Sequence, residues 1–551
     1  MNGGLTIEPV LDTDEIQGNI LGGFNKDHQA LLPFRFGSGP SSVTAVRTWV
    51  AQLFSQITWL RAVVAYKHTR ELRIRAEGVE PRDMPVVWLN IAFSYPGLRK
   101  LTPQADAFEP IFRAGLPAAS QRIGDPTDPA SAGNTSNWLI GNPQSIPDVL
   151  VIVAADVADD LNVKVTEILA DAQTFGLSYD KYDIGHDLSF YNSESLTFPS
   201  GREHFGFEDG ISQPGVRGRL PDAPQKFLTP RQSEGAPDPT STQPEYSAPG
   251  QPLVSVGEFV LGYPRQDDSF PQRSAPPWKL GPEPYAPDPT AVAPYWAKNG
   301  SFLVFRRLRQ DVPAFNQFLE NHAKSLAELP EFAGITSEHL GAMLVGRWRS
   351  GAPLLRSPNQ DDPTLGGTKY ANNAFQFGTA LTTADGFPQP IADPLGKVLP
   401  QCGHIRKVNP RDLDTDQGSP TTTLAHRILR RGIPFGPPLP IGATEDAALE
   451  ERGLLFVSYQ ASIREQFEFL CANWMNDQSK PSIFAPPTGS GYDMIVGQNT
   501  APTGNRARFC LIGASSQKIS TDVDGVREWV IPTGGGYFFT PSKSAVMDVL
   551  T

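Results

Sequence analysis

Apolar residues along the chain gather in four runs of strand length, each followed by a polar break. The runs span residues 85–93, 149–154, 302–306 and 454–459. Short apolar runs bounded by turn-forming residues are typical of buried strands. A helical period follows three of them and predicts helices over about 159–173, 312–326 and 462–476. Ser462 stands where the last of these helices would begin and is a suitable N-cap.

Two of these units precede residue 200 and two follow residue 300, with a Pro- and Ser-rich stretch between them. The pattern predicts two similar α+β halves joined by an irregular segment. We place the N-terminal half at residues 1–220, the connecting segment at 221–294 and the C-terminal half at 295–551. One domain with a large insertion is the alternative. A structureless stretch of this length is unusual inside a compact domain, so we expect part of it to pack as a functional cover.

Composition excludes several classes of protein. The 551-residue chain carries a formal charge of −12, so its surface repels nucleic acid and anionic membranes and suits neutral or cationic small molecules. The 50 Gly and 53 Pro require much loop structure. The first 15 residues lack the features of a signal peptide, and no apolar window is long enough to span a membrane. A cytoplasmic location is the default expectation, with secretion open if a leader has been removed.

Three segments carry residues suited to chemistry. The first, residues 204–215, places Asp209 among glycines, where a carboxylate can project into a cavity or simply cap its own turn. The second, residues 402–411, holds His404 in a basic stretch, as a metal ligand or a structural hydrogen-bonding residue. The third, residues 427–436, contains Arg430 and Arg431 before Gly and Pro, and its alternative is a solvated surface pair.

Together these segments resemble the dye-decolourising peroxidase family, in its long, fungal and cyanobacterial-like subgroup. The sequence at 206–210 looks like the G-x-x-D-G signature, 404–411 like the proximal-histidine stretch, and 430–435 like the distal-arginine stretch. Their order matches, and 26 positions separate His404 from Arg430. Residues 346–353 and 456–460 resemble further segments of the subgroup, and 15–21 looks like the family's opening strand. The fold that the resemblance implies is α+β, two ferredoxin-like halves with a haem in the C-terminal half.

The resemblance also implies a function. It predicts a haem peroxidase that reduces hydrogen peroxide and oxidises dyes, phenols and similar aromatic donors in one-electron steps through a ferryl intermediate. Its cofactor would be a non-covalent haem b, and its iron the bound metal. A non-catalytic haem-binding protein for storage, transport or sensing is the alternative, and a haem-free interaction protein on the same fold is another. A thiolate-ligated haem, through Cys402 or Cys471, is less favoured because the flanking residues do not match.

The same resemblance assigns roles to residues. His404 would bind the iron, while Asp209 as the base and Arg430 as the positive charge would act on peroxide at the opposite face. Arg431 is the alternative if the register is shifted by one. Arg406, two residues after His404, would meet a haem propionate, with a surface position as the alternative. Glu468, on the helix predicted after the fourth run, would accept the second hydrogen bond of His404, with Asp477 as second choice. A solvent-facing helix position is the alternative for Glu468.

Overall fold

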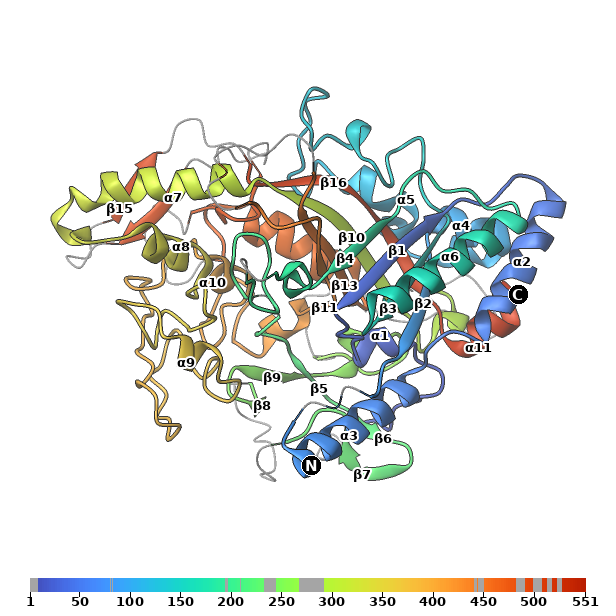
Figure 1. The fold of residues 1–551 in the computed structure, drawn as a ribbon, viewed down its shortest axis with the longest axis horizontal. Helices are drawn as coiled ribbons and strands as arrows, with labels where there is room; N and C mark the ends of the chain where they lie inside the picture. The colour runs from blue at the N-terminus through green and yellow to red at the C-terminus, as the bar shows by residue number, and fades with distance from the viewer. Residues whose placement is uncertain are drawn as a thin grey trace.

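The largest sheet among the described residues closes into a barrel, which we describe from a computed structural model. The structure describes residues 8–79, 81, 83–193, 197–208, 210–231, 244–266, 292–440, 443, 450–481, 491–498, 508–512, 518–522 and 528–551, with the backbone alone for 508–512 and 518–522. The barrel lies at the centre of the molecule (Figure 1). Within the described residues, no helix is both long enough and apolar enough to cross a bilayer.

The N-terminal half contributes four antiparallel strands to the barrel. They are β1 (His28–Phe34), β2 (Val87–Phe93), β3 (Val149–Ala155) and β4 (Asp183–His186). Their order across the sheet is β2-β3-β1-β4. The C-terminal half contributes β10 (Ser301–Gln310), β11 (Leu429–Arg430), β12 (Ile433–Phe435), β13 (Gly453–Gln460) and β16 (Val530–Thr540).

β11 and β12 act as one strand, because both pair with β13 in a single register, from Leu429↔Tyr459 to Phe435↔Gly453. With that strand counted once, the order of the second half is β12-β13-β10-β16. Numbered along the chain, both halves therefore share the strand order 2-3-1-4, which is ferredoxin-like. The predicted duplicated α+β fold is confirmed.

The two halves meet at two narrow seams. Among the described residues, a single pair of residues, Phe435↔Gly185, joins β12 to β4, and a single pair, Phe539↔Phe93, joins β16 to β2. The predicted boundaries at residues 220 and 294 fall between the two sets of barrel strands, and they stay a prediction. Much of the connecting segment, at 232–243 and 267–291, lies outside the described residues.

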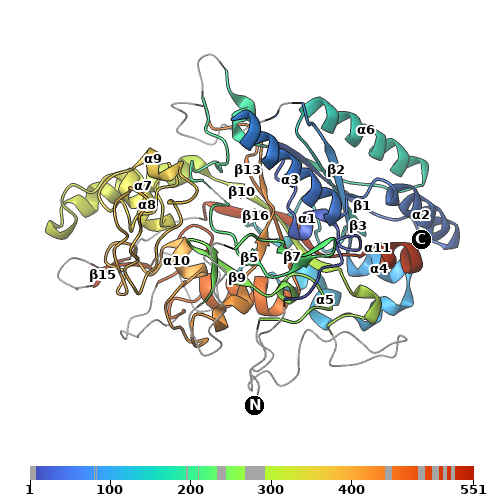
Figure 2. The ribbon, with the colours of Figure 1, turned by 90° about the horizontal axis from the view of Figure 1, so that it is seen from below.

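Helices cover the barrel on opposite sides. They are α1 (Gly18–Leu21), α2 (Pro40–Phe54), α3 (Leu60–Glu77), α4 (Tyr95–Leu101), α5 (Pro110–Ala119), α6 (Ala158–Thr174), α7 (Val312–Ala327), α8 (Ser337–Val345), α9 (Pro363–Gly366), α10 (His404–Val408) and α11 (Lys543–Ala545). Helices α2, α4 and α6 gather at one side, and α7, α8, α9 and α10 at the other, in both ribbon views (Figures 1 and 2). Short strands lie outside the barrel: β5 (Gly215–Val216), β6 (Arg219–Leu220), β7 (Ala223–Phe227), β8 (Tyr246–Ala248), β9 (Gln251–Val254), β14 (Arg508–Ile512) and β15 (Lys518–Asp522).

Side-chain alternation along the strands creates an inner and an outer core. Leu303 and Phe305 of β10 point into the barrel, in a cluster that joins side chains of both halves. Phe302 and Val304 point outward, into a cluster that includes the residues of α2 and α6. This parity decides which residues of β10 can reach a site on the outside of the barrel.

Two sequence predictions differ from the structure. Residues 15–21 were expected as a strand, but Gly18–Leu21 form the short helix α1. The expected helix after β13 exists and begins at Ser462, whose hydroxyl accepts a hydrogen bond from Glu465 N. It is wound as two π-helical segments, η8 (Ile463–Glu468) and η9 (Leu470–Met475), rather than as an α-helix. π-Helical turns occur often at functional sites.

Candidate active site

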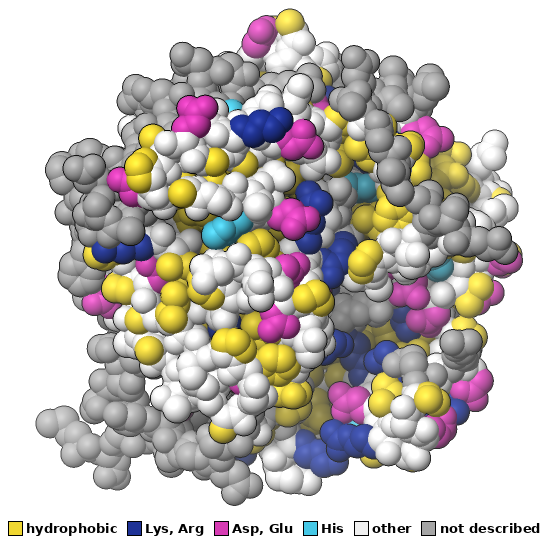
Figure 3. Space-filling view, turned by 60° about the vertical axis from the view of Figure 1, so that its left-hand side comes forward, with side chains coloured by type: hydrophobic (Ala, Val, Ile, Leu, Met, Phe, Trp, Pro, Cys, Tyr) yellow, Lys and Arg dark blue, Asp and Glu magenta, His cyan; other side chains and the backbone are white. Residues whose placement is uncertain are grey.

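A cavity of about 300 Å³ opens on the outer face of the C-terminal half. Its floor is the outward row of the sheet, Arg306, Leu308 and Gln310 of β10 with Leu454 and Phe456 of β13. Helix α10 and the π-helical segments cover it from the other side. Figure 3 shows that this side of the molecule is hollowed and that Lys and Arg side chains gather along the hollow. This agrees with the arginines among the lining residues.

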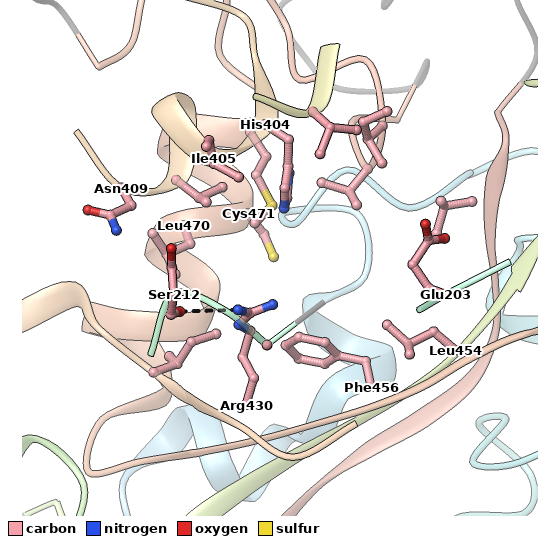
Figure 4. Close-up of a pocket in the computed structure, with 18 of the residues that line it drawn as sticks. Glu203, Ser212, His404, Ile405, Asn409, Arg430, Leu454, Phe456, Leu470 and Cys471 are labelled. Atoms are coloured by element: carbon pink, nitrogen blue, oxygen red, sulfur yellow. Dashed lines mark hydrogen bonds between the residues drawn. The ribbon is translucent and has the colours of Figure 1, made fainter. Parts of the chain in front are cut away.

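His404 is the first residue of α10, and its ring points into the cavity (Figure 4). Its Nδ1 donates a hydrogen bond to Asp493 Oδ2 at 2.7 Å. A carboxylate acceptor fixes the tautomer, so that Nε2 carries the lone pair. His404 thus presents one oriented nitrogen ligand to the cavity.

Asp493 is a buried carboxylate that stays ionised. Burial raises the pKa of Asp493, but the adjacent His404 and the hydrogen bonds lower it by more, so the net shift of the pKa is downward. Its second oxygen, Oδ1, accepts from Ile495 N at 2.9 Å and from Val496 N at 3.1 Å. The charge beside Nδ1 makes the imidazole a stronger donor to a metal.

Glu468, predicted as the acceptor of His404, is elsewhere, and this prediction is wrong. Its carboxylate binds Arg122 at 2.7 and 3.0 Å and accepts from the hydroxyl of Tyr537 at 2.9 Å. Asp477, the second choice, accepts from Ser479 N at 2.8 Å and caps a turn. Position within η8 explains the error, because a π-helical segment turns its residues differently from the α-helix that the sequence predicts.

Arg406 was expected at a haem propionate, and this prediction is also wrong. It is fully buried and donates to Pro394 O at 2.9 Å and Leu399 O at 3.2 Å, away from the lining of the cavity. Two positions along a helix correspond to a turn of about 200°. Arg406 therefore lies on the face of α10 opposite His404.

Arg347, Arg411 and Arg427 line the cavity instead, beside Arg306 of its floor. Arg347 and Arg411 both donate to Asn373 Oδ1, at 2.7 and 2.6 Å, and Arg411 stacks on Phe375 with its guanidinium 3.6 Å from the ring centre. Arg427 has no hydrogen-bond or ion-pair partner for its guanidinium among the described residues. Burial lowers the pKa of Arg347 and Arg411 to about 9 and that of Arg427 to about 10, so all three keep their charge at neutral pH.

Arg430 lies across the cavity from His404 (Figure 4). Its Nη2 donates to Ser212 O at 3.2 Å. Arg431 points to the opposite side of the strand and donates to the carbonyls of Asn19 and Ile20 at the end of α1, at 3.0 and 3.1 Å. The first arginine of the pair faces the cavity, and the second is structural.

Asp209 lies outside the described residues. Its chain neighbours Glu208 and Gly210 both line the cavity. The pKa of Glu208 is raised by burial, although Arg202 and Arg347 oppose the shift. The role assigned to Asp209 stays a prediction.

The two candidate thiols differ. Cys402 is buried in the apolar cluster under α8 and does not line the cavity. Cys471 of η9 does line it (Figure 4), but burial raises its pKa to about 12. Burial thus favours the protonated thiol, and His404, held by Asp493, is the better oriented iron ligand at this cavity.

The residues present fit a haem. One imidazole nitrogen faces the cavity, apolar side chains such as Leu454, Phe456 and Leu470 form its walls, and Arg427 offers an unpaired guanidinium for a carboxylate. Sequence reasoning missed Asp493 and the three arginines. Arg347 and Arg411 stand inside segments 346–353 and 404–411, which resemble the family, and Arg427 begins the segment 427–436. Asp493 carries no signal beyond a single acid in an apolar run.

Comparison with known proteins decides the family. The family model for the DyP dimeric alpha+beta barrel domain matches residues 15–182, and that for the Dyp-type peroxidase C-terminal domain matches 352–498. The dye-decolorizing peroxidase msp1 of Mycetinis scorodonius is 31% identical over 98% of this chain and 88% of its own length. The dye-decolorizing peroxidase of Mycena epipterygia is 32% identical over 98% of this chain and 87% of its own.

The chain belongs to the dye-decolourising peroxidase family. A solved ancestral D-type dye-decolorizing peroxidase superposes with a TM-score of 0.73 at 31% identity, and the match covers 98% of this chain and 100% of that one. A solved family member in complex with 2,6-dimethoxyphenol superposes with a TM-score of 0.66 at 26% identity, covering 98% and 100%. This dye-decolourising peroxidase is thus an oxidoreductase that depends on haem iron and uses hydrogen peroxide to oxidise dyes and phenols. The relatives give no support to a non-catalytic haem-binding role.

Proposed function

We propose that the cavity holds a non-covalent haem b. His404 Nε2 would bind the iron, and Arg347, Arg411 and Arg427 would bind the haem propionates. The proposal rests on one observation: His404, hydrogen-bonded to Asp493, and Arg430 lie on opposite sides of the same cavity. When bound, the haem supplies the two-electron reduction of peroxide and the one-electron oxidation of donors.

On the His404 side, the protein sets the electron donation of the imidazole. Asp493 holds the proton of Nδ1 in a hydrogen bond and carries a full charge, so the ring is partly imidazolate in character. This arrangement favours the oxidised states of a bound metal. The two backbone bonds to Asp493 Oδ1 keep the carboxylate in place.

On the opposite side, Arg430 and Asp209 divide the work on peroxide. Asp209 takes the proton from the near oxygen of hydrogen peroxide and returns it to the far oxygen, which leaves as water. The guanidinium of Arg430 stabilises the negative charge that develops as the O–O bond breaks. Phenolic and anthraquinone dyes are the donors that we propose, in keeping with the dimethoxyphenol complex of the structural neighbour.

Absorption spectra of the haem-loaded protein, before and after one equivalent of peroxide, test this assignment. We expect Arg430→Leu and Asp209→Asn to keep the resting spectrum and to react with peroxide roughly 10²- to 10³-fold more slowly, as when one preorganised charge stabiliser is removed. Arg356→Lys is the matched control, because this buried arginine binds Asp385 and Pro388 O and does not line the cavity. Normal peroxide reaction rates in both variants would exclude the proposed roles.

A further inference from the structure

One edge of the strand that carries Arg430 faces away from β13. Arg431 N donates to Val457 O of β13 at 2.7 Å, so the backbone groups of Arg431 face β13. In an antiparallel pair, hydrogen-bonded and non-bonded positions alternate. The N–H and C=O of Arg430 therefore point away from β13. On that side, the described residues of β4 reach the strand only at Phe435.

The side chain of Gln213 occupies this edge. Arg430 N donates to Gln213 Oε1 at 3.3 Å, and Gln213 Nε2 donates to Arg430 O at 3.2 Å. One side-chain amide thus binds both backbone groups of one residue, as a neighbouring strand would, and Arg431 Nη1 also donates to the same carbonyl at 3.0 Å. The preceding residue, Ser212, accepts from the Arg430 guanidinium through its carbonyl at 3.2 Å.

The same loop is anchored at its other end to the same strand. His204 Nε2 donates to Phe435 O at 2.9 Å. His204 and Gln213 flank the chain segment that contains Asp209, so both ends of that segment bond the strand that carries Arg430. The segment around Asp209 is therefore tied at both ends to the strand that carries Arg430.

We infer that Gln213 is a positioning residue that fixes Arg430 relative to the Asp209 loop. The inference rests on the proposed function. Bonds to both backbone groups of Arg430 hold its Cα, and the long side chain amplifies any backbone displacement at the guanidinium. A misplacement of about 1 Å can slow a reaction roughly 10²-fold. Gln213 acts through Arg430 and takes no part in proton transfer.

A second glutamine provides a matched control. Gln17 makes the same reciprocal pair with a strand residue, accepting from Ile91 N at 2.9 Å and donating to Ile91 O at 3.0 Å. Gln17 is fully buried and does not line the cavity. Removing it costs the same reciprocal pair, together with a bond to Pro541 O at 2.8 Å, without touching the strand of Arg430.

The experiment compares Gln213→Leu, Gln213→Glu and Gln17→Leu. In the haem-free protein, hydrogen exchange reports the protection of the Arg430 amide. In the haem-loaded protein, stopped-flow absorption reports the second-order rate with peroxide, and steady-state assays report the KM of a dye. Melting temperatures monitor folding. Because Glu keeps the acceptor and loses the donor, it remains informative if the Leu variant does not fold.

We expect Gln213→Leu to expose the Arg430 amide and to slow the peroxide reaction about 10- to 100-fold, with the dye KM unchanged. Gln213→Glu should fall between it and the wild type in both readouts. Gln17→Leu should lower the melting temperature and leave the peroxide rate unchanged.

Three results would overturn the inference. The first is a Gln213→Leu protein that reacts within twofold of the wild-type rate. The second is an equal loss in Gln17→Leu, which would make the effect a general loss of stability. The third is Gln213→Glu reacting as slowly as Gln213→Leu while the Arg430 amide stays protected, which would mean direct contact with peroxide. A wild-type protein that binds haem but does not react with peroxide would instead refute the proposed function.

Discussion

The two halves of the barrel have the same strand order but opposite uses for the outer face of the sheet. In the N-terminal half, α6 follows β3 and packs Leu161, Val165 and Ile168 against it in a closed apolar cluster. In the C-terminal half, the segments after β13 are η8 and η9, and a cavity separates part of them from the sheet. The outer face of the sheet is thus filled by a core in one half and bordered by a cavity in the other.

Side-chain chemistry along one strand shows how the difference arises. The outward row of β10 begins with Phe302 and Val304, which join the apolar cluster. It continues with Arg306, Leu308 and Gln310, which line the cavity. Polar groups in this row cannot be covered by an apolar helix face without a cost in solvation. The duplicated fold supplies the scaffold, and the residue types at equivalent positions decide whether it is filled or left open.

A large-to-small substitution in each half tests most strongly whether the outer faces of the two halves differ in packing. Leu161→Ala should lower the free energy of unfolding by roughly 2–5 kcal/mol, because it leaves a void in a closed core. Leu470→Ala should cost less in the haem-free protein, because it enlarges a cavity that already exists. Urea unfolding of the two haem-free variants measures both values. Equal losses would mean that the outer faces do not differ in packing.

Removing the charge of each of two buried carboxylates near the π-helical segments tests which of them supports His404. Asp493→Asn should weaken haem binding or slow the peroxide reaction about 10- to 100-fold, because the charge beside His404 Nδ1 is lost. Glu468→Gln should leave both unchanged and lower only the melting temperature, because Glu468 binds Arg122 and Tyr537. The opposite pattern in haem titrations would restore Glu468 as the partner of His404.

The pH dependence of stability probes the seam between the halves. Burial lowers the pKa of His204 from 6.5 to about 4. Between these values the unfolded chain binds a proton that the folded protein does not, so stability is full above pH 6.5 and falls as the pH drops toward 4. We expect His204→Gln to reduce this slope by up to about 1.4 kcal/mol per pH unit. Urea unfolding from pH 7 to 4 measures it, and an unchanged slope would show that His204 is protonated in the folded protein.

Much of the fold could be predicted from the sequence, for particular reasons. The apolar runs of β2, β3, β10 and β13 and the periods of α6 and α7 are strong local signals. β16 was missed because Pro532 and the glycines at 534–536 interrupt its pattern, and β1 because Pro33 stands within it. The π-helical winding after β13 has no residue signature, so the facing of Glu468 could not be foreseen.

The site residues also divide into those that the sequence could predict and those that it could not. His404 and Arg430 stand in motifs, and the structure brings both to one cavity. Asp493 could not be found, because 89 positions separate it from His404 and its role depends on tertiary contact alone. Arg406 was misassigned because the sequence shows its distance from His404 along the chain but not its side of α10.

Haem titration of His404→Gly tests the central claim most directly. The wild-type apoprotein should bind one equivalent of haem with a Soret band typical of histidine ligation. His404→Gly should bind haem weakly with a shifted band, and added imidazole should restore the wild-type spectrum by taking the place of the missing ring beside Asp493. A variant that binds haem with unchanged affinity and an unchanged Soret band without imidazole would contradict the account.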